Sequence, residues 1–164
     1  MKAFGFAAYS GSGKTTLIEN LLPVLVRRGL RVSVIKHAHH AFDVDRPGKD
    51  SYRHRQAGAT EVLVSSGVRW ALMHELRQEA EPELPRLLER LSPCDLVLVE
   101  GFKRQTIPKM EIHRIAAATP LLFPDDSDIV ALATDALIAS RLPRFALDDF
   151  TGIAGFIVDH LGVA

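Results

Sequence analysis

Short apolar runs alternate along the chain with segments in which apolar residues recur every three or four positions. The runs have the length and the β-branched content of buried strands, and the spaced segments have the periodicity of a helix with one apolar face. Strands are predicted at 3–8, 31–36, 95–100, 109–114, 129–134 and 145–147. Helices are predicted at 15–28, 50–57, 83–91 and 149–161. Strands that alternate with helices favour a three-layer α/β fold with a mostly parallel sheet.

Two segments of the pattern predict strands of another kind. The apolar runs at 61–65 and 69–74 are separated by a Ser-Gly turn signal, which predicts an antiparallel hairpin. The strand at 109–114 alternates between polar and apolar side chains. Alternation is typical of a strand with one solvated face, so we expect an edge strand there.

Composition narrows the choice of partners and of compartment. The 164 residues include 20 Lys or Arg and 20 Asp or Glu, and this balance gives no general attraction to nucleic acid or to an anionic membrane. Cys94 is the one cysteine, which excludes an internal disulfide. No apolar stretch reaches the ~20 residues that span a bilayer, and the first residues lack a signal-peptide pattern. We expect a single cytoplasmic domain over residues 1–164 that binds neither nucleic acid nor a membrane.

The segment at 8–16 carries the strongest chemical signal. Its residues, Ala-Tyr-Ser-Gly-Ser-Gly-Lys-Thr-Thr, match the phosphate-binding pattern G-x-x-x-x-G-K-[ST] at every fixed position except Ala8. Because a strand precedes it and a helix follows, backbone N–H groups and the positive end of the helix dipole can surround a phosphate. Lys14 would reach the β- and γ-phosphates, and the Thr15 hydroxyl would bind Mg²⁺. A strand-to-helix turn without a ligand is the alternative.

A second chemical signal, an acidic residue, lies at the end of the strand at 95–100. Glu100 ends this strand, and we expect its carboxylate to face Mg²⁺ or the water shell of the metal. A surface carboxylate that merely ends a strand is the alternative. In the loop after 31–36, Asp43 and Asp45 could act through the metal. Arg46 and Lys49 in the same loop could neutralise charge that develops on the γ-phosphate.

Three histidines in the same loop raise the question of a second metal. His37, His39 and His40 lack a sulfur partner, so a solvated loop is favoured over a transition-metal site. His37 and the preceding Lys36 fit better as structural or phosphate-side residues.

Two features bear on the base of a nucleotide. Asp135 follows the strand at 129–134, and a carboxylate there could accept hydrogen bonds from N1–H and the 2-amino group of guanine, which adenine lacks. An aspartate that begins a turn is the alternative. Arg69 and Trp70 suggest stacking on a base, but a tryptophan in an apolar hairpin is more often part of a core or an interface.

These segments together resemble one known family. The stretches at 10–16, 35–40, 43–51, 69–73 and 99–103 are similar to those of the MobB family of molybdopterin-guanine dinucleotide biosynthesis adapter proteins. The resemblance implies a P-loop NTPase-like fold, GTP and Mg²⁺ as ligands, and weak GTPase activity. It also implies a homodimer whose interface includes the hairpin strands. The implied partners are molybdopterin cofactor and the molybdenum cofactor guanylyltransferase that converts it to its guanine dinucleotide form.

The resemblance also implies roles by position. It assigns Thr15 and Glu100 to Mg²⁺, and it names no catalytic residue that orients water. Contact with the nucleotide is implied for Gly11, Ser12, Gly13, Lys14, Thr15, Thr16, Asp45, Arg46 and Lys49.

Two other functions remain open from the residues alone. A small-molecule kinase on the same fold would need a lid with several arginines, and the basic segment at 103–109 is short for a lid. A scaffold without enzymatic activity would keep the loop without using it for hydrolysis.

Overall fold

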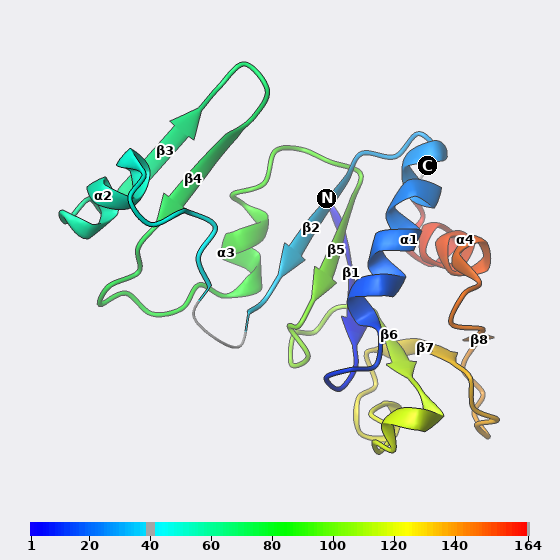
Figure 1. Ribbon diagram of the computed structural model, residues 1–164. Coiled ribbons are helices and arrows are strands. Elements are labelled where there is room, and N and C mark those ends of the chain that lie inside the picture. The colour runs from blue at the N-terminus through cyan, green and yellow to red at the C-terminus, as the bar shows by residue number, and fades with distance from the viewer. Residues whose placement is uncertain (39–41, 164) are drawn as a thin grey trace. The chain divides into compact units, whose positions relative to one another are not determined.

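The chain folds into two compact units (Figure 1). The computed structural model describes residues 1–38 and 42–163. Met1–His37 and Leu84–Ala164 make up the first unit, and Ala38–Glu83 makes up the second. The single domain expected over the whole chain stays a prediction, because compact units need not fold independently. No helix in the described part of the chain is both long enough and apolar enough to cross a bilayer.

A six-stranded sheet organises the first unit. Its strand order is β2-β5-β1-β6-β7-β8, and every pair of neighbours runs parallel, which confirms the predicted α/β class. The carboxyl ends of all these strands therefore meet at one edge of the sheet, where ligands bind in such folds. The strands are β1 (Lys2–Ala7), β2 (Val32–Lys36), β5 (Leu96–Glu100), β6 (Lys109–His113), β7 (Ile129–Thr134) and β8 (Arg144–Phe145).

Helices cover both faces of this sheet. Neighbouring residues of β5 point to opposite faces, so Leu98 and Val97 belong to different clusters of the core. On the Leu98 face lie α1 (Lys14–Arg27) and α4 (Phe150–Leu161), side by side in Figure 1. On the Val97 face lies α3 (Leu84–Leu88). Apolar burial on both sides explains why the strands read as nearly continuous apolar runs.

The predicted edge strand at 109–114 is wrong, because β6 pairs with β1 on one side and with β7 on the other. The polar positions that suggested an edge are buried. Lys109 is 2% exposed, and its Nζ lies 2.8 Å from Asp126 Oδ2. Glu111 is 1% exposed and accepts hydrogen bonds from two backbone N–H groups at 122–123. Charges are tolerated in this central strand because neighbouring loops supply partners, which alternation alone does not reveal.

Element boundaries differ modestly from the predicted ones. The third predicted helix is shorter than expected and ends at Leu88, and the last strand covers Arg144–Phe145. Two 3₁₀ turns, η1 (Ile115–Ala117) and η2 (Phe123–Asp125), were not predicted. Such short turns carry no periodicity that a sequence pattern can reveal.

The second unit consists of a short helix and a hairpin. β3 (Glu61–Ser65) and β4 (Trp70–His74) pair antiparallel, which confirms the predicted hairpin. α2 (Asp50–Gln56) lies against β3. None of the described residues of Ala38–Glu83 is fully buried, and Trp70 is 63% exposed. Trp70 is therefore not part of a core among the described residues of the second unit.

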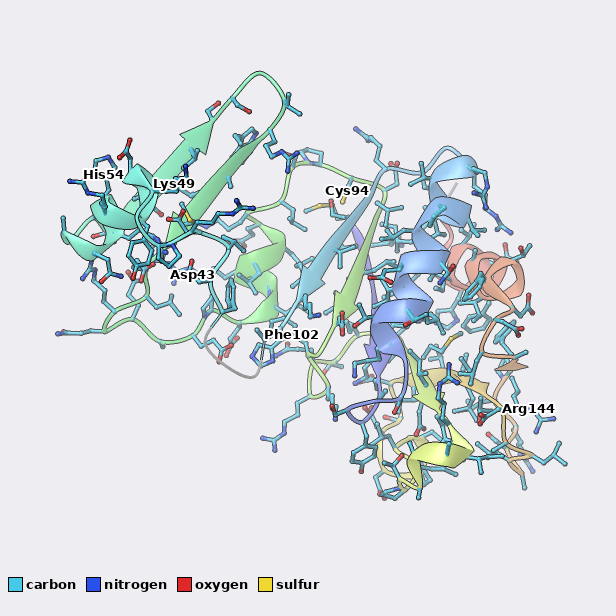
Figure 2. The ribbon with its side chains drawn as sticks, in the orientation of Figure 1. Asp43, Lys49, His54, Cys94, Phe102 and Arg144 are labelled. Carbon is cyan, nitrogen blue, oxygen red and sulfur yellow. The ribbon has the colours of Figure 1, made fainter. Side chains whose placement is uncertain are left out.

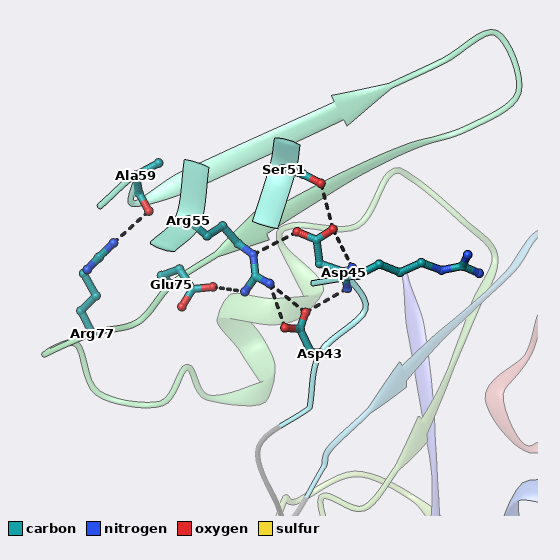
Figure 3. Close-up of polar contacts among 8 residues, drawn as sticks. Asp43, Asp45, Ser51, Arg55, Ala59, Glu75 and Arg77 are labelled. Carbon is teal, nitrogen blue, oxygen red and sulfur yellow. Dashed lines mark hydrogen bonds and ion pairs between the residues drawn. The ribbon is translucent and has the colours of Figure 1, made fainter. Parts of the chain in front are cut away.

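Polar contacts to Arg55 of α2 hold the second unit together (Figure 3). Both oxygens of Asp43 lie 2.9 Å from its Nη2, and Asp45 Oδ2 lies 3.3 Å from its Nε. Its Nη1 lies 2.6 Å from Glu75 Oε1. Hydrogen bonds to Glu75 and Asp43 raise the pKa of the guanidinium further above its usual range. The planar guanidinium of arginine carries several N–H donors in a fixed fork. Arg55 can therefore link α2 to the preceding loop and to the segment that follows β4.

Candidate functional site

The loop between β1 and α1 begins the candidate site at the carboxyl edge of the sheet. Gly13 has a φ of +86° and immediately precedes Lys14, the first residue of α1. This left-handed conformation is one that glycine adopts readily. Since Gly13 has no side chain to cap the helix, the N–H groups of the first turn keep the positive partial charge that attracts anions. The loop thus has the local chemistry of a phosphate site.

Lys14 lies among charges of both signs. Its Nζ donates to the backbone oxygen of Ala8 at 3.4 Å. Burial is the main cause that lowers the pKa of Lys14, and the Glu100 carboxylate acts in the opposite direction. The positive charges of Lys103 and Lys36 lower it further. A bound anion would offset the repulsion among these ammonium groups, so the local electrostatics favour phosphate.

Glu100 stands at the end of β5 next to the loop. Thr15 Oγ1 donates to Glu100 Oε1 at 3.3 Å, and Lys36 Nζ lies 3.8 Å from Glu100 Oε2. The glutamate side chain is 11% exposed. A hydroxyl and a carboxylate are the hard oxygen ligands that Mg²⁺ prefers, so this pair fits the metal expected from the sequence.

The turn after β5 packs closely against the end of β2, the neighbouring strand. Gly101 has a φ of +100°, and a Cβ at this position would lie 2.9 Å from the Cβ of His37. The His37 ring packs against Phe102, labelled in Figure 2, with 5.0 Å between ring centroids. The His37 N–H donates to the Glu100 backbone oxygen at 2.8 Å. His37 is thus structural and holds Lys36 beside Glu100, while His39 and His40 lie outside the described residues.

Arg114 is a site residue that the sequence analysis missed. Its Nε donates to the Ser12 backbone oxygen at 3.2 Å, and the guanidinium lies against Gly13. Arg114 follows β6, the strand misread as an edge strand. A prediction that paired β6 with β1 would have put Arg114, at the carboxyl end of β6, beside the phosphate loop.

Two further features of the loop suggest that it accommodates a ligand. Ser12 is 1% exposed, and its Oγ has no hydrogen-bond partner among the described residues. A buried hydroxyl without a partner is unusual, and a bound oxyanion or water would supply one. Lys103 Nζ lies 4.8 Å from the centre of the Tyr9 ring, which places another positive charge against the loop.

The predicted nucleotide contacts Asp45, Arg46 and Lys49 belong to the second unit. Asp45 Oδ1 accepts hydrogen bonds from the Ser51 hydroxyl at 2.8 Å and from the Arg46 N–H at 3.0 Å (Figure 3). Burial acts to raise the pKa of Asp45, but these bonds, together with the one from Arg55, lower it below its ordinary value. Arg46 and Lys49 line an open groove beside α2 and β3. The roles of Asp45, Arg46 and Lys49 toward a nucleotide stay predictions.

Comparisons with known proteins match this chain to one family along nearly its whole length. The family model described as molybdopterin guanine dinucleotide synthesis protein B, MobB, matches residues 3–135. The chain is 45% identical over 159 residues to the molybdopterin-guanine dinucleotide biosynthesis adapter protein of Escherichia coli (strain K12), covering 95% of this chain and 91% of that protein. It is 42% identical to the protein of the same name from Haemophilus influenzae, covering 96% and 88%.

Solved structures show the same fold. A crystal structure of molybdopterin-guanine biosynthesis protein B superposes with a TM-score of 0.78 at 30% identity, covering 98% of this chain and 99% of that one. A crystal structure of Bacillus subtilis MobB superposes with a TM-score of 0.76 at 25% identity, covering 98% of each chain.

Proposed function

The chain belongs to the molybdopterin guanine dinucleotide synthesis protein B (MobB) family of biosynthesis adapters, and we propose that it works there by binding GTP with Mg²⁺ at its phosphate loop. One observation carries the proposal. Lys14, Thr15 and Glu100 converge at the carboxyl edge of the sheet, with 3.3 Å between the threonine hydroxyl and the glutamate carboxylate. The chain thus presents a cation, a hydroxyl and a carboxylate around an uncapped helix start, as a metal-bound triphosphate requires.

Each group has a distinct role in holding the triphosphate. The N–H groups at the start of α1 and the Lys14 ammonium neutralise phosphate oxygens. Thr15 and Glu100, whose side chains are hydrogen-bonded to each other, would hold Mg²⁺, and the bound ion would supply two further positive charges to the phosphates. Arg114 keeps the loop in shape through its bond to the Ser12 backbone oxygen.

Hydrolysis at this site is expected to be slow. Two groups at this edge, Glu100 and His113, are already hydrogen-bonded. Glu100 accepts from Thr15, and the two ring nitrogens of His113 each lie 3.3 Å from a protein oxygen, one of Thr134 and one of Thr119. A general base must reach and orient the attacking water, which groups held in other bonds do poorly. This supports a weak GTPase that acts mainly as an accessory protein.

The hairpin of the second unit supports a homodimer. Leu63 pairs with Leu72, and Trp70 lies on the same face two positions along β4. Leu63, Trp70 and Leu72 are 61%, 63% and 44% exposed within the chain. An isolated two-stranded hairpin is marginal in water, so a second copy that covers this face would stabilise it.

Light scattering tests the dimer. Trp70→Glu places a charge in the proposed interface and is expected to give a monomer. Val68→Glu is the matched control, because Val68 is 85% exposed in the turn beyond the strands. A wild-type chain that is monomeric at micromolar concentration would contradict the proposal.

Calorimetry tests the nucleotide site. We expect the wild type to bind GTP in the presence of Mg²⁺, and Lys14→Ala to weaken binding about tenfold or more, because a hydrogen bond to a charged group is lost. Lys2→Ala, which removes an exposed lysine at the start of β1, is the control. Equal affinity of the Lys14→Ala variant and the wild type would overturn the assignment. In the same preparations, the yield of guanine dinucleotide formed by the guanylyltransferase is expected to rise when the wild-type chain is added.

A further inference from the structure

The loop after β5 brings another lysine to the phosphate loop. Lys103 follows Glu100 on this loop, and its Nζ lies 4.8 Å from the centre of the Tyr9 ring. Among residues 1–38 and 42–163, no carboxylate pairs with the Lys103 ammonium. A positive charge held against an aromatic face, and not neutralised by an acid, keeps most of its attraction for an anion.

The backbone that carries Lys103 is held from behind. The buried Lys109 ammonium donates to the backbone oxygens of Lys103 and Gln105, both at 3.0 Å. The Lys103 N–H donates to the Gly101 oxygen at 2.9 Å, in the turn where Gly101 has a φ of +100°. Because the backbone is restrained, mainly the lysine side chain remains to be ordered when a ligand binds, which lowers the entropic cost of the contact.

Strand order determines which end of a nucleotide Lys103 meets. β5 and β6 flank β1 on opposite sides. Lys103 follows β5, which Glu100 ends, whereas Arg114 follows β6. Since Glu100 is proposed to hold Mg²⁺ at the β- and γ-phosphates, Lys103 belongs to the side of the terminal phosphates.

The charge of Lys103 also acts on the group that reaches these phosphates. Burial is the main cause that lowers the pKa of Lys14, Glu100 opposes it, and the positive charges of Lys103 and Lys36 lower it further. The repulsion among these ammonium groups falls when an anion binds between them. GTP carries more negative charge than GDP, and the additional charge lies on the γ-phosphate. An ammonium on the metal side of the loop therefore favours the triphosphate.

We propose that Lys103 binds the γ-phosphate and makes the site select a nucleoside triphosphate over a diphosphate, with the Tyr9 ring positioning its ammonium. This inference rests on the proposed function, because it takes the phosphate loop as the site of GTP. It adds the means by which the adapter distinguishes GTP from the GDP that hydrolysis leaves.

Calorimetry with Mg²⁺ and two nucleotides tests the contact: GDP, and GppNHp, a GTP analogue that resists hydrolysis. Lys103→Met keeps the apolar stem but removes the ammonium. We expect it to weaken GppNHp binding about tenfold or more and GDP binding less than about twofold, because only GppNHp carries the γ-phosphate. Lys103→Arg keeps the charge and should retain most of the preference. Arg104→Met removes the exposed cation next along the loop and should leave the ratio of the two affinities unchanged.

The role of Tyr9 is tested through Lys103. Tyr9→Phe keeps the aromatic face and should bind GppNHp as the wild type does, whereas Tyr9→Leu removes the face. We expect Tyr9→Leu to weaken GppNHp binding about threefold in the wild-type background and to have no further effect in the Lys103→Met background. An equal effect of Tyr9→Leu in both backgrounds would show that Tyr9 does not act through Lys103.

Lys14→Ala separates this inference from the function on which it rests. It should weaken both nucleotides, since Lys14 reaches the β-phosphate as well as the γ-phosphate. If Lys14→Ala weakens binding but Lys103→Met changes the two affinities equally or not at all, the γ-phosphate contact is wrong and the phosphate site stands. If Lys14→Ala has no effect, the phosphate site itself is wrong. A wild type that binds GDP and GppNHp equally would also overturn the inference.

Discussion

The Thr15 hydroxyl donates a hydrogen bond to Glu100 Oε1 at 3.3 Å across 85 positions of sequence. The parallel pairing of β1 with β5 places Phe6 opposite Glu100, so the loop that follows β1 begins where β5 ends. One oxygen of the pair comes from the start of a helix and the other from the end of a strand. Neither element alone presents both oxygens, and the strand pairing creates the arrangement.

The Glu100 carboxylate should control the response to metal. Glu100→Gln keeps an acceptor for the Thr15 hydroxyl but removes the negative charge. We expect the gain in GTP affinity caused by Mg²⁺ to fall about tenfold, while affinity in EDTA stays the same or rises, because the carboxylate repels phosphate. Calorimetry with Mg²⁺ and with EDTA measures both quantities. Glu89→Gln, an exposed glutamate after α3, is the control, and an equal Mg²⁺ effect in both variants would refute the metal role.

Lys109 should be essential to the stability of the first unit. Its Nζ lies 2.8 Å from Asp126 and donates to the backbone oxygens of Lys103 and Gln105 at 3.0 Å. Lys109→Met keeps the apolar stem but leaves these acceptors without the ammonium. We expect a loss of about 3–5 kcal/mol in the free energy of unfolding, measured by urea denaturation with circular dichroism. Lys2→Met removes an exposed lysine and should cost little. Equal stability of the two variants would show that the buried ion pairs contribute nothing.

Arg55 should be essential to the order of the second unit. Arg55→Lys keeps one positive charge but cannot donate in a fork to Asp43, Asp45 and Glu75 together. We expect hydrogen-exchange protection of β3 and β4 to fall at least about tenfold, whereas protection of β1 and β5 stays unchanged. Arg53→Lys provides a control two residues away, because the Arg53 side chain is 74% exposed. Unchanged protection in the Arg55→Lys variant would contradict this role.

The hairpin should lose stability as pH rises above 6.5, the ordinary pKa of histidine. His74 Nδ1 lies 2.8 Å from Glu61 Oε1 and its Nε2 lies 3.3 Å from Glu79 Oε1. The hydrogen bond with Glu61 is the main cause that raises the pKa of His74 above 6.5, and the Glu79 charge adds to it. A raised pKa means that the protonated form stabilises the hairpin. This stabilisation is fully present below pH 6.5 and is lost as pH rises through the higher pKa of the folded state.

Protection factors of β3 and β4, measured across that pH range together with an NMR titration of His74, check the effect. His74→Gln should remove the pH dependence, and His54→Gln, which changes an exposed histidine of α2, should keep it. A pH-independent hairpin in the wild type would show that the His74 contacts do not stabilise the folded state.

The sequence by itself determined the local pieces of this protein. The glycine-rich loop with Lys14 and Thr15, the buried strands and the antiparallel hairpin all follow from residue types and spacings within one short segment. The expectation that Glu100 faces Mg²⁺ rested on the pattern of phosphate-loop proteins, in which an apolar strand that ends in an acid lies beside the first strand.

Only the tertiary structure decided which segments meet. It placed β6 between β1 and β7, with Lys109 buried in ion pairs, and so brought Arg114 to the phosphate loop. It also gathered three carboxylates around Arg55 in a unit that has no fully buried residue among those described. The physical reason is that strand order and long-range ion pairs depend on how distant segments pack. Periodicity and turn chemistry act over a few residues and do not encode that packing.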